Sequence, residues 1–190
     1  MKLLIAALLA LVAAPVMAGD VMDTAFAKTQ GPHPFNVRDL VMMDRVSDPQ
    51  LSPDGRYAAF GVRSTDYAAN KGVNAVYVLD LHGGQPVKVI DKGGSARWSA
   101  DGHSLYFIAP AKGVAQLWRL DLGDKGSLNL AKHGPAAQVS HTPLDLGGYK
   151  LSPDGKHVLL SYDVFTDCTT LVCTKARADA RDKDKASATL

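Results

Sequence analysis

Three aspartates stand in one repeated local sequence and are the first candidates for chemistry. Asp54, Asp101 and Asp154 each follow a serine by two positions and precede a glycine. Three carboxylates could act as general acids and bases or bind a cation. The repeated setting favours a structural role, because an aspartate at this place in a tight turn bonds to its own backbone. All 19 acidic residues are aspartates, so chemistry that needs a glutamate is excluded within this chain.

The other reactive side chains form no recognisable catalytic or metal-binding pattern. None of the histidines shows the His-x-x-x-His spacing of a zinc site, and we expect all of them on the surface or in loops: 33, 82, 103, 133, 141 and 157. The nearest match to a Gly-x-Ser-x-Gly nucleophile turn is Gly93-Gly94-Ser95-Ala96-Arg97, which has arginine in place of the second glycine. We expect it to be a loop. The sequence therefore predicts no catalytic, metal-binding or cofactor-binding residue.

The first 18 residues predict an export signal. Lys2 supplies a positive charge, the stretch from Leu3 to Val12 is wholly apolar, and small residues precede Ala18. This order is typical of a secretory signal peptide cleaved between Ala18 and Gly19. The chain lacks an apolar run of about 18 residues, so no ordinary membrane span is expected. We therefore expect a periplasmic or secreted protein that leaves the membrane after cleavage.

The export signal decides how the two cysteines are interpreted. Cys168 and Cys173 are separated by four residues. In an oxidising compartment such a pair favours a disulfide, and two free thiols are the alternative. A zinc site is disfavoured, because two thiols have no histidine close in sequence to complete a tetrahedral ligand set.

Composition excludes two broad classes of protein. Hydrophobic residues make up 46% of the 190 residues and charged residues 21%, which argues against disorder over the whole length. The formal net charge is only +2, from 21 basic and 19 acidic residues. A strongly basic nucleic-acid binder is therefore excluded.

The repeated turn predicts the strands on either side of it. Proline sets φ at the second turn position, and glycine takes the left-handed conformation that closes a bulged hairpin. The turn residues are Pro53, Asp54, Gly55, Asp101, Gly102, Pro153, Asp154 and Gly155, and Ala100 replaces proline in the second copy. A strand is expected after each glycine. Between the copies, residues 75–81 and 116–122 alternate in polarity and both end in Leu-Asp-Leu.

The spacing of the turns predicts the fold. The three aspartates are 47 and 53 residues apart, a period typical of stacked or radial repeats. Each unit contains about four short antiparallel strands, as a propeller blade does. We therefore predict an all-β fold: an incomplete β-propeller of about three four-stranded blades over residues 35–173. Three turns at this spacing give two whole units and the start of a third. One short helix over residues 35–43, capped by Asn36 and stopped by Asp48-Pro49, precedes it.

The ends of the chain differ from this repeat. Residues 19–34 are expected to be a flexible lead-in, and residues 174–190 a charged helical or disordered end.

These features together resemble secreted bacterial serine peptidases of the prolyl oligopeptidase family, the dipeptidyl aminopeptidases and acylaminoacyl peptidases. The resemblance rests on the entry segment 35–55, on the three Ser-x-Asp-Gly turns, which are similar to TolB-like propeller repeats, and on the segment 167–175. It covers roughly residues 35–180. It implies a propeller followed by an α/β-hydrolase domain with a Ser–Asp–His triad, for which this chain has no matching nucleophile turn.

The resemblance implies the non-catalytic N-terminal propeller segment of an exported serine peptidase. In such an enzyme the propeller limits access of short peptides to the active site. The expected partners are the hydrolase domain of the full-length parent and, through it, a peptide substrate. The first alternative is a periplasmic TolB-like interaction module without enzymatic activity, and the second is a partial propeller whose copies assemble into a ring.

Overall fold

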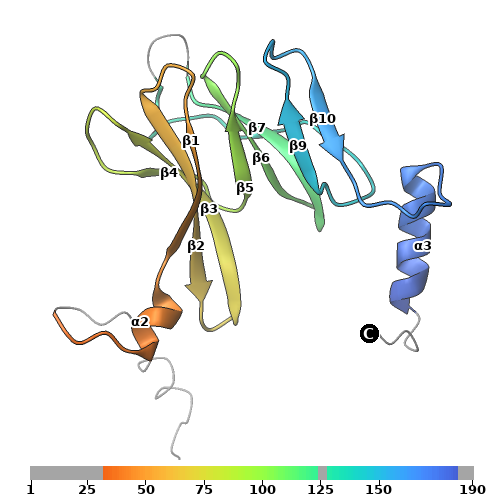
Figure 1. Ribbon diagram of the computed structural model, residues 1–190, viewed down its shortest axis with the longest axis horizontal. Helices are drawn as coiled ribbons and strands as arrows, with labels where there is room; N and C mark the ends of the chain where they lie inside the picture. Colours follow the sequence, from red (N-terminus) through yellow and green to blue (C-terminus); the bar gives the residue numbers. More distant parts are fainter. Residues whose placement is uncertain (1–31, 124–127, 184–190) are drawn as a thin grey trace, which may run out of the picture.

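The computed structural model describes residues 32–123 and 128–183 and places them in three antiparallel sheets flanked by two helices (Figure 1). The expected signal peptide, its cleavage site between Ala18 and Gly19, nearly all of the lead-in and the last seven residues lie outside the described residues. None of the described helices is long and apolar enough to cross a membrane.

The first two sheets have four strands each, as the sequence predicted. The first sheet contains β1 (Arg45–Leu51), β2 (Tyr57–Asp66), β3 (Lys71–Asp80) and β4 (Val87–Ile90). The second contains β5 (Gly94–Trp98), β6 (Ser104–Ala111), β7 (Val114–Asp121) and β8 (Ala137–Gln138). In both, each strand pairs with the next one along the chain, so both are antiparallel meanders with the make-up of propeller blades.

The third sheet is smaller than a four-stranded blade, as the count of two whole units and the start of a third predicted. Within the described residues it contains only β9 (Gly148–Leu151) and β10 (Val158–Ser161). The chain then leaves the sheet and forms helix α3 (Leu171–Lys183). The expected boundary between residues 173 and 174 therefore falls inside a helix, and the expectation of three four-stranded units holds for two of them.

Helix α2 (Val37–Met42) begins where the sequence predicted and ends for a different reason. The Asn36 side chain accepts a hydrogen bond from the backbone N–H of Arg38 at 2.8 Å, and the Asp39 carboxylate accepts one from the N–H of Asn36 at 2.8 Å. These two bonds are a capping box. The helix ends at Met43, which is already extended, whereas Asp48-Pro49 lies inside strand β1 and not at the end of the helix.

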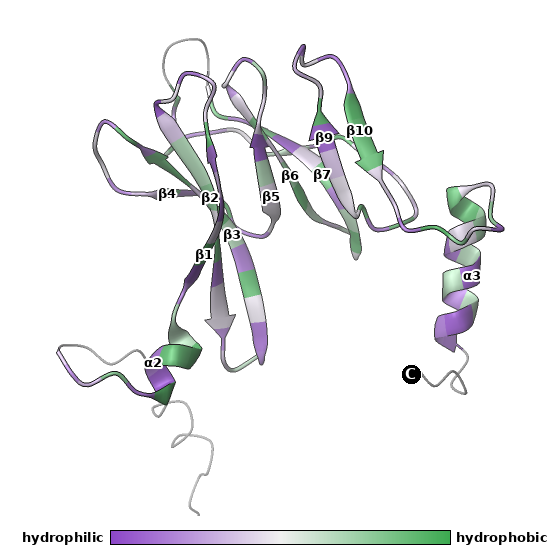
Figure 2. Cartoon of the chain, viewed as in Figure 1, coloured by the Kyte–Doolittle hydropathy of each residue, from purple (hydrophilic) through white to green (hydrophobic). Residues whose placement is uncertain are grey.

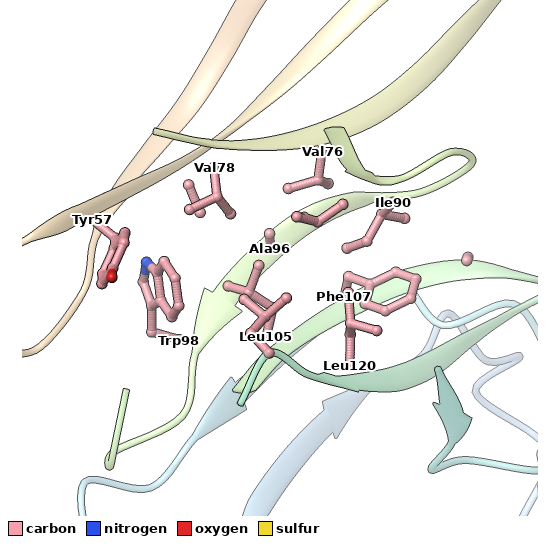
Figure 3. Close-up of a cluster of buried hydrophobic side chains, with 13 residues drawn as sticks. Tyr57, Val76, Val78, Ile90, Ala96, Trp98, Leu105, Phe107 and Leu120 are labelled. Carbon is pink, nitrogen blue, oxygen red and sulfur yellow. The ribbon is translucent and has the colours of Figure 1, made fainter. Parts of the chain in front are cut away.

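The hydrophobic core lies between the first and second sheets (Figure 3). Tyr57, Val76 and Val78 of the first sheet face the second. The side chains that meet them from the second sheet are Ala96, Trp98, Leu105, Phe107 and Leu120. Each sheet has two faces, and burying one apolar face against the next sheet is what makes the pair stable.

Trp98 connects the two sheets most directly. Its side chain is only 9% exposed and its ring centroid lies 6.4 Å from that of Tyr57. Its indole N–H donates to the Gln50 carbonyl of the first sheet at 3.1 Å. One residue thus contributes both apolar burial and a hydrogen bond to the contact between the sheets.

Replacing this indole should destabilise the protein. Trp98→Ala removes the buried ring and leaves the Gln50 carbonyl unpaired, so the free energy of unfolding should fall by about 3 kcal/mol. Phe35→Ala is the control, because Phe35 is 67% exposed and its loss should change stability by less than about 0.5 kcal/mol. Urea denaturation monitored by circular dichroism measures both. Equal stability of the two variants would contradict the role of Trp98.

Candidate functional site

The three predicted turn aspartates bond to their own turns. The hydroxyls of Ser52, Ser99 and Ser152 each donate to the aspartate two residues on, at 2.5 Å in all three turns. Each aspartate also accepts the backbone N–H two residues further along, at 3.0 Å. The serine hydroxyl is the main cause that lowers the pKa of Asp54, Asp101 and Asp154 below the ordinary value. These carboxylates therefore stabilise turns and are not brought together as a catalytic set.

Neighbouring turns touch one another through their glycines. Gly102 has φ of +76°, and a Cβ placed on it would lie 3.3 Å from Cδ of Pro53 in the preceding turn. A Cβ on Gly155, with φ of +69°, would likewise lie 3.6 Å from Cβ of Ala100. The second residue of each turn thus lies against the glycine of the next one. Glycine is needed at position 102 for its conformation and for this close approach.

The first strands of the three sheets, β1, β5 and β9, form one side of the molecule (Figure 1). A bulge interrupts β1 at Asp48 and β5 at Ser95, which have φ of 51° and 54°. Each bulged residue lies four positions before the turn serine, and Gly148 occupies that position in the third copy. Bulges redirect side chains and carbonyls at the edge of a sheet.

Contacts between these strands join the three sheets. The Arg97 guanidinium of β5 donates to the Asp48 carboxylate of β1 at 2.7 Å. The Tyr149 hydroxyl of β9 lies 2.7 Å from the carbonyl oxygens of Ser95 and Tyr106, so it can donate to either. With Gln50 and Trp98, the residues Asp48, Arg97 and Tyr149 form what we call the inner-strand site.

A hollow of about 420 Å³ opens at the inner-strand site. Its lining includes Gln50, Arg97 and Tyr149, one residue from each first strand. The Arg97 side chain lines the hollow and is 40% exposed, whereas its partner Asp48 lies outside the lining. Burial raises the pKa of Tyr149 well above its ordinary value, so its hydroxyl stays a protonated donor at neutral pH. The hollow can bind polar peptide groups through the Arg97 guanidinium.

The described residues do not assemble a hydrolytic centre. The segment around Ser95 forms strand β5 and not the loop that was expected. Ser95 lies in a bulge of this strand and not between a strand and a helix, where a nucleophile turn belongs. Ser104 lies near His103 and His133 around a second hollow, but it is 1% exposed and donates to Asp121 at 2.6 Å. No group of three or more His, Cys, Asp or Glu side chains in the described part of the chain could hold a metal ion.

The predicted disulfide lies away from the inner-strand site. Cys168 and Cys173 are bonded, with their Cα atoms 5.6 Å apart. The bond connects the loop after β10 to the first turn of α3. Phe165 on the same loop packs under Arg177, whose guanidinium carbon lies 4.7 Å from the ring centroid. The disulfide therefore holds a local loop and helix together.

Asp48, Arg97 and Tyr149 could not be assigned to a site from the sequence. Asp48-Pro49 predicts the end of a helix, and no local pattern gives Arg97 or Tyr149 a role. Their contacts join residues 49 and 54 positions apart in the chain, which no local pattern reveals. A signal was present, since Asp48, Ser95 and Gly148 stand at one fixed distance from the repeated turn.

Comparison with known proteins finds peptidases. Dipeptidyl-peptidase 5 of Porphyromonas gingivalis is 26% identical over 157 residues, which are 81% of this chain and 22% of that protein. The uncharacterized peptidase YuxL of Bacillus subtilis is 25% identical over 127 residues, 65% of this chain and 18% of that protein. The chain thus spans about a fifth of the length of these curated relatives. No family model matches the chain.

A solved structure shows the same likeness in fold. Acylaminoacyl peptidase of Pyrococcus horikoshii aligns with 68% of this chain and 20% of its own, with a TM-score of 0.52 and 20% identity. The β-propeller domain of the Trilobed protease from Pyrococcus furiosus aligns with 62% of this chain and 33% of its own, with a TM-score of 0.48 and 18% identity. The resemblance to peptidases of this type that the sequence indicated is confirmed over the matched region.

The Tyr149 hydroxyl can be tested by removing it alone. Tyr149→Phe removes the hydroxyl that donates to the Ser95 or the Tyr106 carbonyl, so the free energy of unfolding should fall by about 1–2 kcal/mol. The control is Tyr77→Phe, because the Tyr77 ring stacks on Phe60 with centroids 6.1 Å apart and its hydroxyl makes no hydrogen bond among the described residues. Urea denaturation compares the two. A loss for Tyr77→Phe as large as for Tyr149→Phe would contradict this assignment.

The turn aspartates predict a pH dependence of stability. The folded pKa of Asp101 is below its ordinary value, so its contribution to stability is present above the unfolded pKa and is lost as pH falls through the folded value. Asp101→Asn should therefore lower Tm at pH 7, and the difference from the wild type should shrink below about pH 4. Asp163→Asn, at an exposed loop position, is the control. A Tm difference for Asp101→Asn that is constant from pH 7 to pH 3 would contradict this role.

Proposed function

We propose that this chain is the non-catalytic N-terminal propeller segment of an exported serine peptidase. The observation that carries the proposal is the pair of consecutive four-stranded meanders packed face to face, followed by the start of a third sheet. Such a set is part of a radial array, because a propeller has about 4–8 blades. The peptidases similar to this chain are several times longer, which leaves room for further blades and a hydrolase domain.

Within such an enzyme the inner-strand site has a defined position. The first strands of successive sheets lie side by side, so in a closed array they would surround the central channel. A short peptide passing this channel would meet Arg97, Asp48 and the carbonyls of the bulged strands. The proposed contribution of this chain is therefore to limit access and hold short peptides, while the Ser–Asp–His chemistry belongs to the parent enzyme.

Export is part of the same proposal. The positive, apolar and small-residue order of residues 1–18 supports cleavage between Ala18 and Gly19. The bonded cysteines fit an oxidising compartment.

A second candidate is an exported interaction module without chemistry. The inner-strand hollow favours it, because it offers the basic groups of Arg97 and Lys150 with no activated nucleophile beside them. The two candidates differ in whether a hydrolase domain lies on the same polypeptide as this segment.

The parent enzyme can be sought in the native cell. An antibody raised against residues 32–183 should detect an exported polypeptide much larger than 20.2 kDa, and that polypeptide should react with a fluorophosphonate probe for activated serines. Its N-terminal residue should be Gly19. An exported species near the mass of this chain, without probe reactivity, would favour the interaction module and contradict the peptidase proposal.

The purified chain supplies the complementary test. It should neither hydrolyse peptide amides and esters nor react with the probe, and Ser95→Ala should behave identically. Turnover that a substitution within this chain abolishes would contradict the non-catalytic role.

A further inference from the structure

The inner-strand hollow is lined by the same positions of all three repeats. Gln50, Arg97 and Lys150 each stand two positions before the turn serine, and all three line it. The residues directly before and directly after each serine also line it and are apolar: Leu51, Trp98 and Leu151, then Pro53, Ala100 and Pro153. Each repeat therefore contributes one polar and two apolar positions to a single hollow of about 420 Å³.

The charged side chains of this lining are both basic. Among the described residues that line the hollow, Arg97 and Lys150 carry charge, and no aspartate is present. Asp48 pairs with Arg97 but lies outside the lining. Since the pair of Asp48 and Arg97 is neutral as a whole, Lys150 gives the hollow a net positive charge. The lining therefore favours an anionic group.

Both basic side chains have donors left for a ligand. The hydrogen bonds that Arg97 makes within the described residues, to the Asp48 carboxylate and the Ala96 carbonyl, both come from Nη1. Its Nε and Nη2 atoms keep their N–H groups, a pair that matches the two oxygens of a carboxylate. Lys150 is exposed and makes no ion pair in the described part of the chain. A carboxylate can therefore bind here without breaking a contact of the fold.

An apolar group fits beside the carboxylate. Leu51 is 66% exposed although it lies in strand β1, and Leu151 at the end of β9 is half-buried. Figure 2 shows hydrophilic and hydrophobic residues next to each other along β9. A ligand that covers these leucines gains free energy, because apolar surface is removed from water.

We propose that the inner-strand hollow binds the C-terminal carboxylate of a short peptide that ends in an apolar residue. The carboxylate meets the Arg97 guanidinium and the Lys150 ammonium, and the last side chain covers Leu51 and Leu151. A C-terminal apolar residue carries both groups on one residue, as the mixed lining requires. The inference rests on the peptide-holding role proposed above and names the class of peptide that is held.

A titration followed by nuclear magnetic resonance tests the proposal. The probe is N-acetyl-Gly-Ala-Leu with a free C-terminus, added to the purified full chain labelled with ¹⁵N. Amide signals of residues 97–100 and 149–152 should move, and the same peptide with a C-terminal amide should bind about fivefold more weakly. Equal affinity for the two peptides, or no movement of these signals, would overturn the proposal.

Removing one charge tests whether the lining reads the carboxylate. Lys150→Gln should weaken the free acid about three- to fivefold and leave the amide within about twofold, because the lost charge acts on the carboxylate alone. Lys156→Gln is the matched control, since Lys156 is an exposed lysine of the same turn outside the lining. Equal effects of the two substitutions on the free acid would overturn the proposal.

The apolar part has its own test. Leu51→Ser should weaken the free acid and the amide equally, by about threefold, because both lose the same apolar contact. Leu81→Ser is the control, because Leu81 is 48% exposed and lies outside the lining. Unchanged affinity for Leu51→Ser would overturn the apolar specificity.

A last peptide distinguishes the two sources of a carboxylate. N-acetyl-Gly-Asp-Leu with a C-terminal amide carries its carboxylate on a side chain and should bind about threefold more weakly than the free acid. Equal affinity would assign the hollow to acidic side chains and overturn the C-terminal assignment. None of these titrations involves hydrolysis, so their failure leaves the peptidase proposal standing, and the absence of a larger probe-reactive polypeptide leaves this inference standing.

Discussion

The structure depends on the fact that a twisted sheet has two faces and can bury only one of them against a single neighbour. The apolar side chains of the two facing surfaces are removed from water only when the two sheets pack against each other. They are Tyr57, Val76 and Val78 of the first sheet and Leu105, Phe107 and Leu120 of the second. The packing of sheet against sheet therefore stabilises both, and each added sheet presents a new face to be covered. The third sheet, with two strands in the described chain, meets this requirement only in part.

Two kinds of contact repeat from one sheet to the next and set how the sheets are arranged. The second residue of each turn touches the glycine of the next turn. A bulged first strand offers a carboxylate or a carbonyl to the strand beside it, as Asp48 does to Arg97 and Ser95 does to Tyr149. Between the first and second sheets, apolar side chains fill the space behind these contacts. Arg97 and Tyr149, which join the sheets, also line the hollow to which we assign peptide binding.

Local sequence predicted the turns, the strands after them and the cap of α2, because each is determined by residues within about five positions of one another. The first turn is determined by Pro53-Asp54-Gly55, and the cap of α2 by Asn36 with Asp39. The inner-strand site could not be predicted in this way. Asp48-Pro49 is a strong signal for the end of a helix, but here it forms a bulge whose carboxylate pairs with an arginine 49 residues away. The spacing of the three turns also predicted two whole units and the start of a third, which agrees with the two-stranded third sheet of the described chain.

The central claim is that the first two sheets form one cooperative unit through their shared core, while the third is joined to the second by the Tyr149 hydroxyl and by the approach of Gly155 to Ala100. Native-state hydrogen exchange measures this most directly, residue by residue. The account predicts that amides of β2, β3, β6 and β7 exchange with one common free energy of opening, and that amides of β9 and β10 open at a clearly lower one. Separate opening energies for the first and second sheets, or protection of β10 equal to that of β6, would contradict it.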